Sequence, residues 1–258
     1  MTPRALAALA LLALFGLCPR PAGAQSVQAD LSDYAFAITS NFTGASLLLY
    51  GTVVSPTPVP PGTFDVVVVV RGPPVPLTVR RKERVVAFWI NRHVVRFEPV
   101  PSLYYVVSNR PLGEIATPSV LRRNGIGTAF IDPDPDLSAG AVPEAVDADT
   151  FARALVRTKI KQGLYREFPD ALFFRDSLFR APVPIPANAQ VGRYQVEVYL
   201  LREGSILGAR SMSFHIEKTG FERLVYDLAH SAPVFYALGV ILMATLMGLG
   251  GNLIFRQR

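Results

Sequence analysis

Three aspartates at alternate positions form the segment of this chain best suited to chemistry. Asp132, Asp134 and Asp136 are separated by prolines, and carboxylates spaced in this way can converge on a hard cation such as Ca²⁺. Two departures from a calcium-binding EF-hand loop argue against that use. Leu137 stands where the glycine of the sharp turn belongs, and Pro143 stands where the bidentate glutamate belongs. We therefore expect a solvated acidic loop, keep the three carboxylates as a weak metal candidate, and assign no metal or other cofactor.

The histidines and the cysteine offer no further catalytic pattern. His93, His215 and His230 lie far apart in the sequence, and the chain contains neither the H-E-x-x-H motif of zinc proteases nor the G-x-S-x-G motif of serine hydrolases. The only cysteine is Cys18, which falls in the N-terminal targeting segment described below. We therefore expect a protein that is not an enzyme, with no catalytic residue to name.

Two clusters of basic residues are candidates for contact with anionic headgroups or with an acidic partner. The first is predicted to lie between two strands, and the second repeats every four residues along one face of a predicted helix. Solvated charges that discourage pairing between sheet edges are the alternative for the first cluster. The two clusters together comprise Arg80, Arg81, Lys82, Arg84, Arg153, Arg157 and Lys161.

The net charge does not indicate a nucleic-acid partner. The formal charge is +6, but Arg4, Arg20, Arg256 and Arg258 lie in the two terminal segments, which leaves +2 for the rest of the chain. A surface of that charge is not the basic footprint expected of a nucleic-acid-binding domain.

The C-terminal segment predicts a membrane span. Residues 233–255 contain no charge and are followed by a basic tail, residues 256–258. About 20 apolar residues suffice for a helix to cross a bilayer, and a basic tail favours the cytoplasmic side. Ala244, Gly248 and Asn252 follow one another at intervals of four, so this helix would present small residues and an amide on one face for packing against a partner helix.

The N-terminal segment, residues 1–24, is predicted to be a secretory signal peptide. Arg4 provides the positive charge, residues 5–17 the apolar stretch, and residues 22–24 an A-x-A-like cleavage site. Thirteen apolar residues are too few for the alternative, an uncleaved transmembrane helix. Cleavage would remove Cys18 and leave a mature protein without disulfides.

The region between these segments is predicted to be mainly β. Five consecutive valines within Asp65–Arg71 favour a strand buried on both faces. Residues 194–200 alternate strictly, turn at residues 202–205 and return as residues 206–216, as the last hairpin of an immunoglobulin-like sandwich does. We expect two immunoglobulin-like β-sandwich modules, residues 25–110 and 169–217, joined by a helical connector, residues 111–168, and followed by a juxtamembrane amphipathic helix, residues 218–232.

One longer helix is expected within the connector. Asp147 or Asp149 can cap it, and it would continue to about Arg166. Its apolar face would bury Phe151, Ala152, Leu155, Val156, Ile160 and Leu164.

The chain resembles the alphaproteobacterial putative transmembrane protein family over nearly its whole length. The similarity is carried by the valine strand leading into Arg71-Gly72-Pro73, by the segments 81–85 and 87–91, and by Tyr104-Tyr105 and Ser108 before residues 110–112. The resemblance implies a bacterial inner-membrane protein and assigns no active residue.

These features together predict a single-pass inner-membrane protein whose bulk lies in the periplasm and whose C-terminus is cytoplasmic. We expect an accessory or assembly protein of an inner-membrane complex, such as a transporter, with the membrane and an inner-membrane protein as partners. The alternatives are a protein that binds an envelope glycan or lipid and, with least support, a periplasmic hydrolase.

Overall fold

The computed structural model describes residues 25–38, 42–55, 62–85, 88–136, 147–218 and 221–255. The predicted signal peptide, with Cys18, and the basic tail lie outside these described residues, as do Leu137 and Pro143 of the acidic loop.

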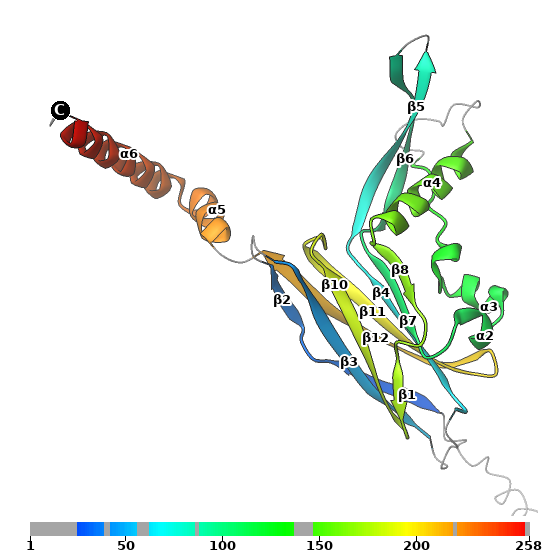
Figure 1. Cartoon of the computed structure of the whole chain (residues 1–258). Coiled ribbons are helices and arrows are strands. Elements are labelled where there is room, and N and C mark those ends of the chain that lie inside the picture. Colours follow the sequence, from blue (N-terminus) through cyan, green and yellow to red (C-terminus); the bar gives the residue numbers. More distant parts are fainter. Residues whose placement is uncertain are drawn as a thin grey trace, which may run out of the picture.

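Two β-sheets packed face to face form the body of the protein (Figure 1). The smaller sheet has the order β1 (Ser26–Leu31), β3 (Gly44–Val54), β10 (Leu178–Pro186) and β9 (Phe173–Arg175). The larger sheet has the order β2 (Ala35–Ile38), β12 (Ser205–Lys218), β11 (Gly192–Arg202), β4 (Asp65–Arg71), β7 (Tyr104–Ser108) and β8 (Tyr165–Phe168). Neighbouring strands are antiparallel except in the pairs β2–β12 and β7–β8. The mainly β fold expected from the sequence is confirmed.

The valine strand β4 is buried on both faces, as its sequence predicts. Val66, Val68 and Val70 face the core between the two sheets. Val67 and Val69 face the opposite side, where the short helices α2 (Leu112–Ile115), α3 (Pro118–Arg123) and η1 (Thr128–Phe130) cover the larger sheet. Because successive side chains of a strand point to opposite faces, an unbroken apolar run suits a strand with a layer on each side.

The strands form one sandwich instead of two separate modules. β3 from the first expected module pairs with β10 from the second, and β4 likewise pairs with β11. The division into modules at residues 25–110 and 169–217 therefore differs from the structure. Sequence periodicity indicates where strands lie but not which strands pair, so consecutive strands were assigned to the same module.

A long two-stranded hairpin projects from the body between β4 and β7 (Figure 1). It consists of β5 (Pro74–Val85) and β6 (Phe88–Pro101), and helix α4 (Ala148–Lys161) packs against its base. The expectation that the first basic cluster lies between two strands is wrong, because these residues belong to β5 itself. The sequence patterns also did not predict strand β1 or the first half of β5, which lies next to the sandwich.

Helix α4 differs from its prediction in its end and in part of its buried face. It ends at Lys161, and the following residues turn into strand β8. Phe151, Ala152 and Leu155 are buried as expected. Ile160, however, is 47% exposed, and Lys159 is buried in its stead.

Two further helices follow the sandwich. Helix α5 (Phe221–Ser231) lies where the amphipathic juxtamembrane helix was expected, and α6 (Pro233–Phe255) has the bounds predicted for the membrane span. At about 1.5 Å per residue, the 23 residues of α6 extend about 35 Å, which is enough to cross a hydrocarbon core of about 30 Å. An 18-residue window of α6, Pro233–Gly250, has a mean hydropathy of 1.9, and none of it is buried against the rest of the described chain.

Candidate functional site

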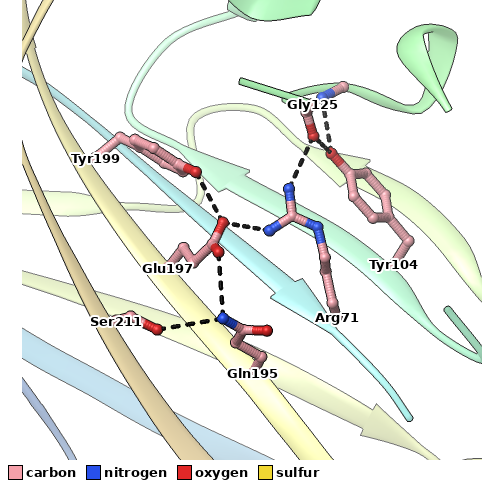
Figure 2. Close-up of polar contacts among 8 residues, drawn as sticks. Arg71, Tyr104, Gly125, Gln195, Glu197, Tyr199 and Ser211 are labelled. Atoms are coloured by element: carbon pink, nitrogen blue, oxygen red, sulfur yellow. Dashed lines mark hydrogen bonds and ion pairs between the residues drawn. The ribbon is translucent and has the colours of Figure 1, made fainter. Parts of the chain in front are cut away.

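An ion pair between β4 and β11 is the centre of a polar cluster on the outer face of the larger sheet (Figure 2). The Arg71 guanidinium contacts the Glu197 carboxylate, and both side chains are more than three-quarters shielded from solvent. The Tyr199 hydroxyl donates to Glu197 Oε2 at 2.7 Å, and Gln195 Nε2 lies 3.4 Å from both Glu197 Oε1 and Ser211 Oγ. Strand alternation explains this grouping, because Gln195, Glu197 and Tyr199 point to the same face.

The same cluster holds the chain segment that follows α3. Arg71 Nη2 donates to the Gly125 carbonyl at 3.1 Å, and the Tyr104 hydroxyl donates to that carbonyl at 2.6 Å. The Gly127 amide in turn donates to the Tyr104 hydroxyl at 2.9 Å. Burial raises the pKa of Tyr104 to about 12, and burial together with the hydrogen bond to Glu197 raises the pKa of Tyr199 to about 12. Both hydroxyls therefore stay protonated at neutral pH, and the Tyr104 hydroxyl fixes the segment to the sheet while the Tyr199 hydroxyl donates to Glu197.

A second polar cluster lies at the opposite end of β4. The buried Asp65 carboxylate accepts two parallel hydrogen bonds from Arg110, at 2.9 and 2.7 Å, and a third from Asn109 at 2.9 Å. A pocket of about 560 Å³ opens beside it, with Glu114 and Glu203 also in its wall. Each glutamate also has a basic neighbour, since Glu114 lies 3.9 Å from Arg110 and Glu203 lies 3.8 Å from Arg202.

A third candidate is a pocket of about 560 Å³ between α4 and the segment around η1. It brings together residues that were predicted separately, since Asp132 of the acidic loop and Arg153 and Arg157 of the basic stripe all line it. Val156 and Ile160 contribute apolar side chains to the wall of this pocket. Asp149 lines it as well, so two carboxylates and two guanidinium groups surround a partly apolar surface.

The rest of the acidic loop, around Asp134 and Asp136, forms backbone hydrogen bonds to β6 and does not form a cluster of carboxylates. The Asp134 carbonyl accepts from the Glu98 amide at 2.9 Å, and the Asp136 amide donates to the Arg96 carbonyl at 2.9 Å. The loop thus extends the β6 side of the hairpin at its base. Within the described residues, no three His, Cys, Asp or Glu side chains are grouped as metal ligands would be.

The three histidines lie on separate elements. His93 is on β6, His215 on β12 and His230 near the end of α5. His230 Nδ1 lies 2.8 Å from the Tyr226 carbonyl, and its ring stacks on the Tyr226 ring at 4.0 Å between centroids. The His230 contact is local to one turn of α5.

The basic residues of β5 are solvent-exposed. Among the described residues, none of the ion pairs involves Arg80, Arg81, Lys82 or Arg84. On α4, Arg153 lies 3.8 Å from Asp147, and all three residues of the stripe are exposed.

The predicted packing face of the membrane helix lies on α6. Ala244 and Gly248 are exposed, and a side chain at Gly248 would meet no atom within 4 Å. Asn252 lies one turn further along the helix, at the same spacing, although its side chain is not among those described.

The polar clusters around Glu197 and Asp65 were missed by the sequence analysis. Arg71 and Glu197 are 126 residues apart in the chain, and Asp65 and Arg110 are 45 apart. The sequence feature that could have indicated these clusters is the charged residue at each end of the valine strand, Asp65 and Arg71. A charged residue at the edge of a buried strand needs a partner, but the sequence does not say which residue supplies it.

Comparison with known proteins identifies the family to which the chain belongs. No curated protein matches the sequence. Residues 26–257 match the family described as "Putative transmembrane protein (Alph_Pro_TM)". Because this match covers the sandwich, the hairpin and both C-terminal helices, the chain belongs to that transmembrane protein family.

Proposed function

We propose that this single-pass membrane protein is a non-enzymatic accessory or assembly subunit of an inner-membrane complex, such as a transporter. The proposal rests on the distribution of apolar and small residues around α6. This helix is apolar around its whole circumference, yet Ala244 and Gly248 leave one strip of it without large side chains. In lipid, small residues favour close approach of a second helix, and the Asn252 amide would gain a hydrogen bond there.

The terminal segments support the proposed location. A cleaved signal at residues 1–24 would deliver the sandwich to the periplasm, and the basic residues 256–258 would remain in the cytoplasm. Anchored in this way, the body would stay within reach of proteins in the same membrane.

The sandwich supports a role in binding other proteins. When β1, β3, β4, β9, β10, β11 and β12 are lettered A to G and the other five strands are set aside, the smaller sheet reads A-B-E-D. In the larger sheet, β12, β11 and β4 then read G-F-C, and both orders are those of immunoglobulin sandwiches. This order supports the proposal that the body is an immunoglobulin-like sandwich. Such sandwiches commonly present their loops to partners.

The proposal that the protein is not an enzyme rests on the roles of its polar side chains. Arg71, Glu197 and Tyr104 fix a chain segment to the sheet, and Arg110 neutralises the buried Asp65. Each of these groups is engaged in a structural contact, and the raised pKa of Tyr104 keeps its hydroxyl protonated, so that it is not available as a general base at neutral pH.

A single substitution on α6 tests the proposal. Gly248→Ile should weaken association with a membrane partner by about 1–2 kcal/mol, because it fills the space through which a second helix approaches. Isoleucine is more apolar than glycine, so insertion into the membrane should not suffer. The measurement is the yield of co-purified membrane protein from a mild detergent extract, relative to the wild type.

Leu246→Ile is the matched control, because Leu246 is 60% exposed and lies on a different face of α6. It should co-purify like the wild type. If Gly248→Ile co-purifies with as much membrane protein as the wild type does, α6 is only an anchor and the helix-packing part of the proposal is wrong.

Binding of an envelope lipid or glycan is a second candidate function. The pocket beside α4 supports it, because Arg153 and Arg157 line a partly apolar wall. In that case the wild-type chain should bind lipid from envelope extracts without a protein partner, and Arg153→Gln with Arg157→Gln should reduce the bound lipid. Association with a stoichiometric membrane protein would favour the first candidate.

A further inference from the structure

The β5–β6 hairpin and the membrane helix leave the sandwich from the same end. β4 and β12 both pair antiparallel with β11, so they run in the same direction. Gln195 of β11 lies opposite Arg71 on one side and opposite Ser213 on the other. β4 ends at Arg71 and leads into the hairpin, and β12 ends five residues beyond Ser213 and leads to α5 and α6 (Figure 1).

The hairpin is long enough to reach the membrane that α6 crosses. At about 3.3 Å per residue, the twelve residues of β5 extend about 40 Å. Helix α5, which separates β12 from α6, has eleven residues and a length of about 16 Å. The far part of the hairpin can therefore come level with the point where α6 enters the bilayer.

The far part of the hairpin also has the surface that a membrane contact requires. Among the described residues, α4 covers the base of the hairpin through Leu77, Val79 and their neighbours on β6. Beyond that point Phe88 is 75% exposed, Ile90 44% and Val94 50%. Large apolar side chains that project into water on a thin ribbon suit insertion among lipid headgroups.

Cations of β5 and these apolar residues lie in the same part of the hairpin but mostly on opposite faces. Strand alternation places Arg80, Lys82 and Arg84 on one face of the ribbon. Ile90 pairs with Glu83 and Phe88 pairs with Val85, so these two apolar residues lie on the other face, with Arg81 and Glu83. All four cations are exposed. Exposed cations and exposed apolar side chains at the far end of one ribbon complement an anionic bilayer surface, where headgroups bind the cations and the interface takes up the apolar side chains.

We propose that the far part of the β5–β6 hairpin is a second membrane contact, which docks on the anionic lipid surface of the membrane that α6 spans. The cations hold the headgroups, and Phe88 and Ile90 enter the interface. The hairpin and α6 then fix the sandwich at two points, which limits how it can tilt above the bilayer. This inference rests on the span and not on the accessory role, so it survives if Gly248→Ile has no effect.

A fluorescence measurement on the full chain in vesicles tests the proposal. A polarity-sensitive probe is attached at Ile90→Cys in a Cys18→Ser background, and the chain is reconstituted into phosphatidylethanolamine vesicles that contain phosphatidylglycerol. The probe emission should shift to the blue and resist quenching by iodide. In phosphatidylcholine vesicles, which lack anionic lipid, both effects should weaken.

Two comparisons isolate the contributions of geometry and charge. A probe at Leu178→Cys, which is 62% exposed at the opposite end of the sandwich, should remain in water in every vesicle. Each cation near an anionic surface favours the bound state by about fivefold, so Arg80→Gln, Lys82→Gln and Arg84→Gln together should lower the bound-to-free ratio about 100-fold. Removal of three exposed cations outside the hairpin, Arg123→Gln, Arg175→Gln and Arg210→Gln, is the charge-matched control and should leave the probe protected.

Because the substituted side chains are exposed, each variant should keep the wild-type melting temperature. A probe at residue 90 that is as accessible to iodide as the probe at residue 178 would overturn the proposal, and the hairpin would then be free to dock on a protein. Protection that is equal in detergent micelles and in phosphatidylcholine would also overturn it, because it would indicate a contact within the protein itself.

Discussion

At the scale of single residues, the polar groups of this protein act mainly on its own stability. The Tyr104 hydroxyl both donates and accepts in the contact that ties Gly125 and Gly127 to the sheet. Arg71 reaches the same carbonyl and lies 5.7 Å from the centroid of the Tyr104 ring. The cluster therefore depends on a neutral phenol beside a guanidinium, and loss of the phenolic proton would leave a buried charge and one hydrogen bond fewer.

We expect stability to fall at alkaline pH because of these tyrosines. Burial raises the pKa values of Tyr104, Tyr194 and Tyr199 to about 12, whereas a tyrosine in the unfolded chain titrates near 10. The folded state then binds more protons than the unfolded state between these values. The stabilising contribution is complete below about pH 10 and is lost as the pH rises through about 12.

The measurement is the melting temperature between pH 8 and pH 12, together with the ultraviolet absorbance of phenolate. Tyr104→Phe is the matched variant. It should be about 1–2 kcal/mol less stable at neutral pH, because two hydrogen bonds are lost, and its alkaline decline should be shallower. An alkaline decline that is unchanged in Tyr104→Phe would show that Tyr104 does not contribute to it.

At the scale of the elements, α4 and the base of the hairpin depend on each other. Phe97 and Val95 of β6 pack with Phe151 and Leu155 of α4 in a small core separate from the sandwich. A two-stranded hairpin is not stable alone in water, so this contact is what keeps the base of β5–β6 ordered.

Phe151→Ala should destabilise this unit by about 3–4 kcal/mol, because a fully buried aromatic ring is replaced by a cavity. Ile160→Ala, on the same helix, is the control and should change the free energy of unfolding by less than about 1 kcal/mol, since Ile160 is 47% exposed. Chemical denaturation of the two variants provides the comparison. Equal losses would mean that the described packing of α4 is wrong.

The buried face of α4 shows how much of the packing can be predicted from the sequence. The pattern places Phe151, Ala152 and Leu155 correctly, but it also assigns a buried position to Ile160 because that residue is apolar. The helix buries Lys159 instead, four residues after Leu155, with its Nζ 3.4 Å from the Ser102 carbonyl and 6.0 Å from the centroid of the Tyr165 ring. Burial lowers the pKa of Lys159. A pattern based on polarity cannot anticipate a lysine whose alkyl stem fills a core position.

The same limit applies to strands. Local sequence patterns predict the valine strand, the alternating strand that begins at Tyr194 and the bounds of α6. Such patterns depend on residues that lie close together in the chain. The pairings β3–β10 and β4–β11, and the Arg71–Glu197 cluster that they create, depend on contacts between distant segments. No local pattern specifies such contacts, so both the single sandwich and its polar clusters were missed.

At the scale of the whole molecule, a sandwich and a single apolar helix are joined through α5. The proposed orientation places residues 25–230 in the periplasm and residues 256–258 in the cytoplasm. A reporter that is active only in the cytoplasm should therefore be active when it is fused after Arg258, and a reporter that is active only in the periplasm should be inactive there. The physical reason is the excess of Arg beside the cytoplasmic end of a span.

The matched fusion places the periplasmic reporter directly after Lys218, in a chain that lacks α5 and α6. It should be active, because only the exported body precedes it. Periplasmic activity after Arg258 would contradict the proposed orientation.

The interleaved pairing of the sheets constrains the order of events during synthesis. Arg71 and its partner Glu197 are 126 residues apart, so the valine strand is made long before the strand that will cover its edge. Until β10, β11 and β12 have been made, the nascent chain carries a β-branched, uncharged segment of the kind that pairs readily with other chains. We therefore expect a holding chaperone to shield this segment. Because β12 precedes α6 in the chain, we expect the sandwich to close only when most of the chain has been made.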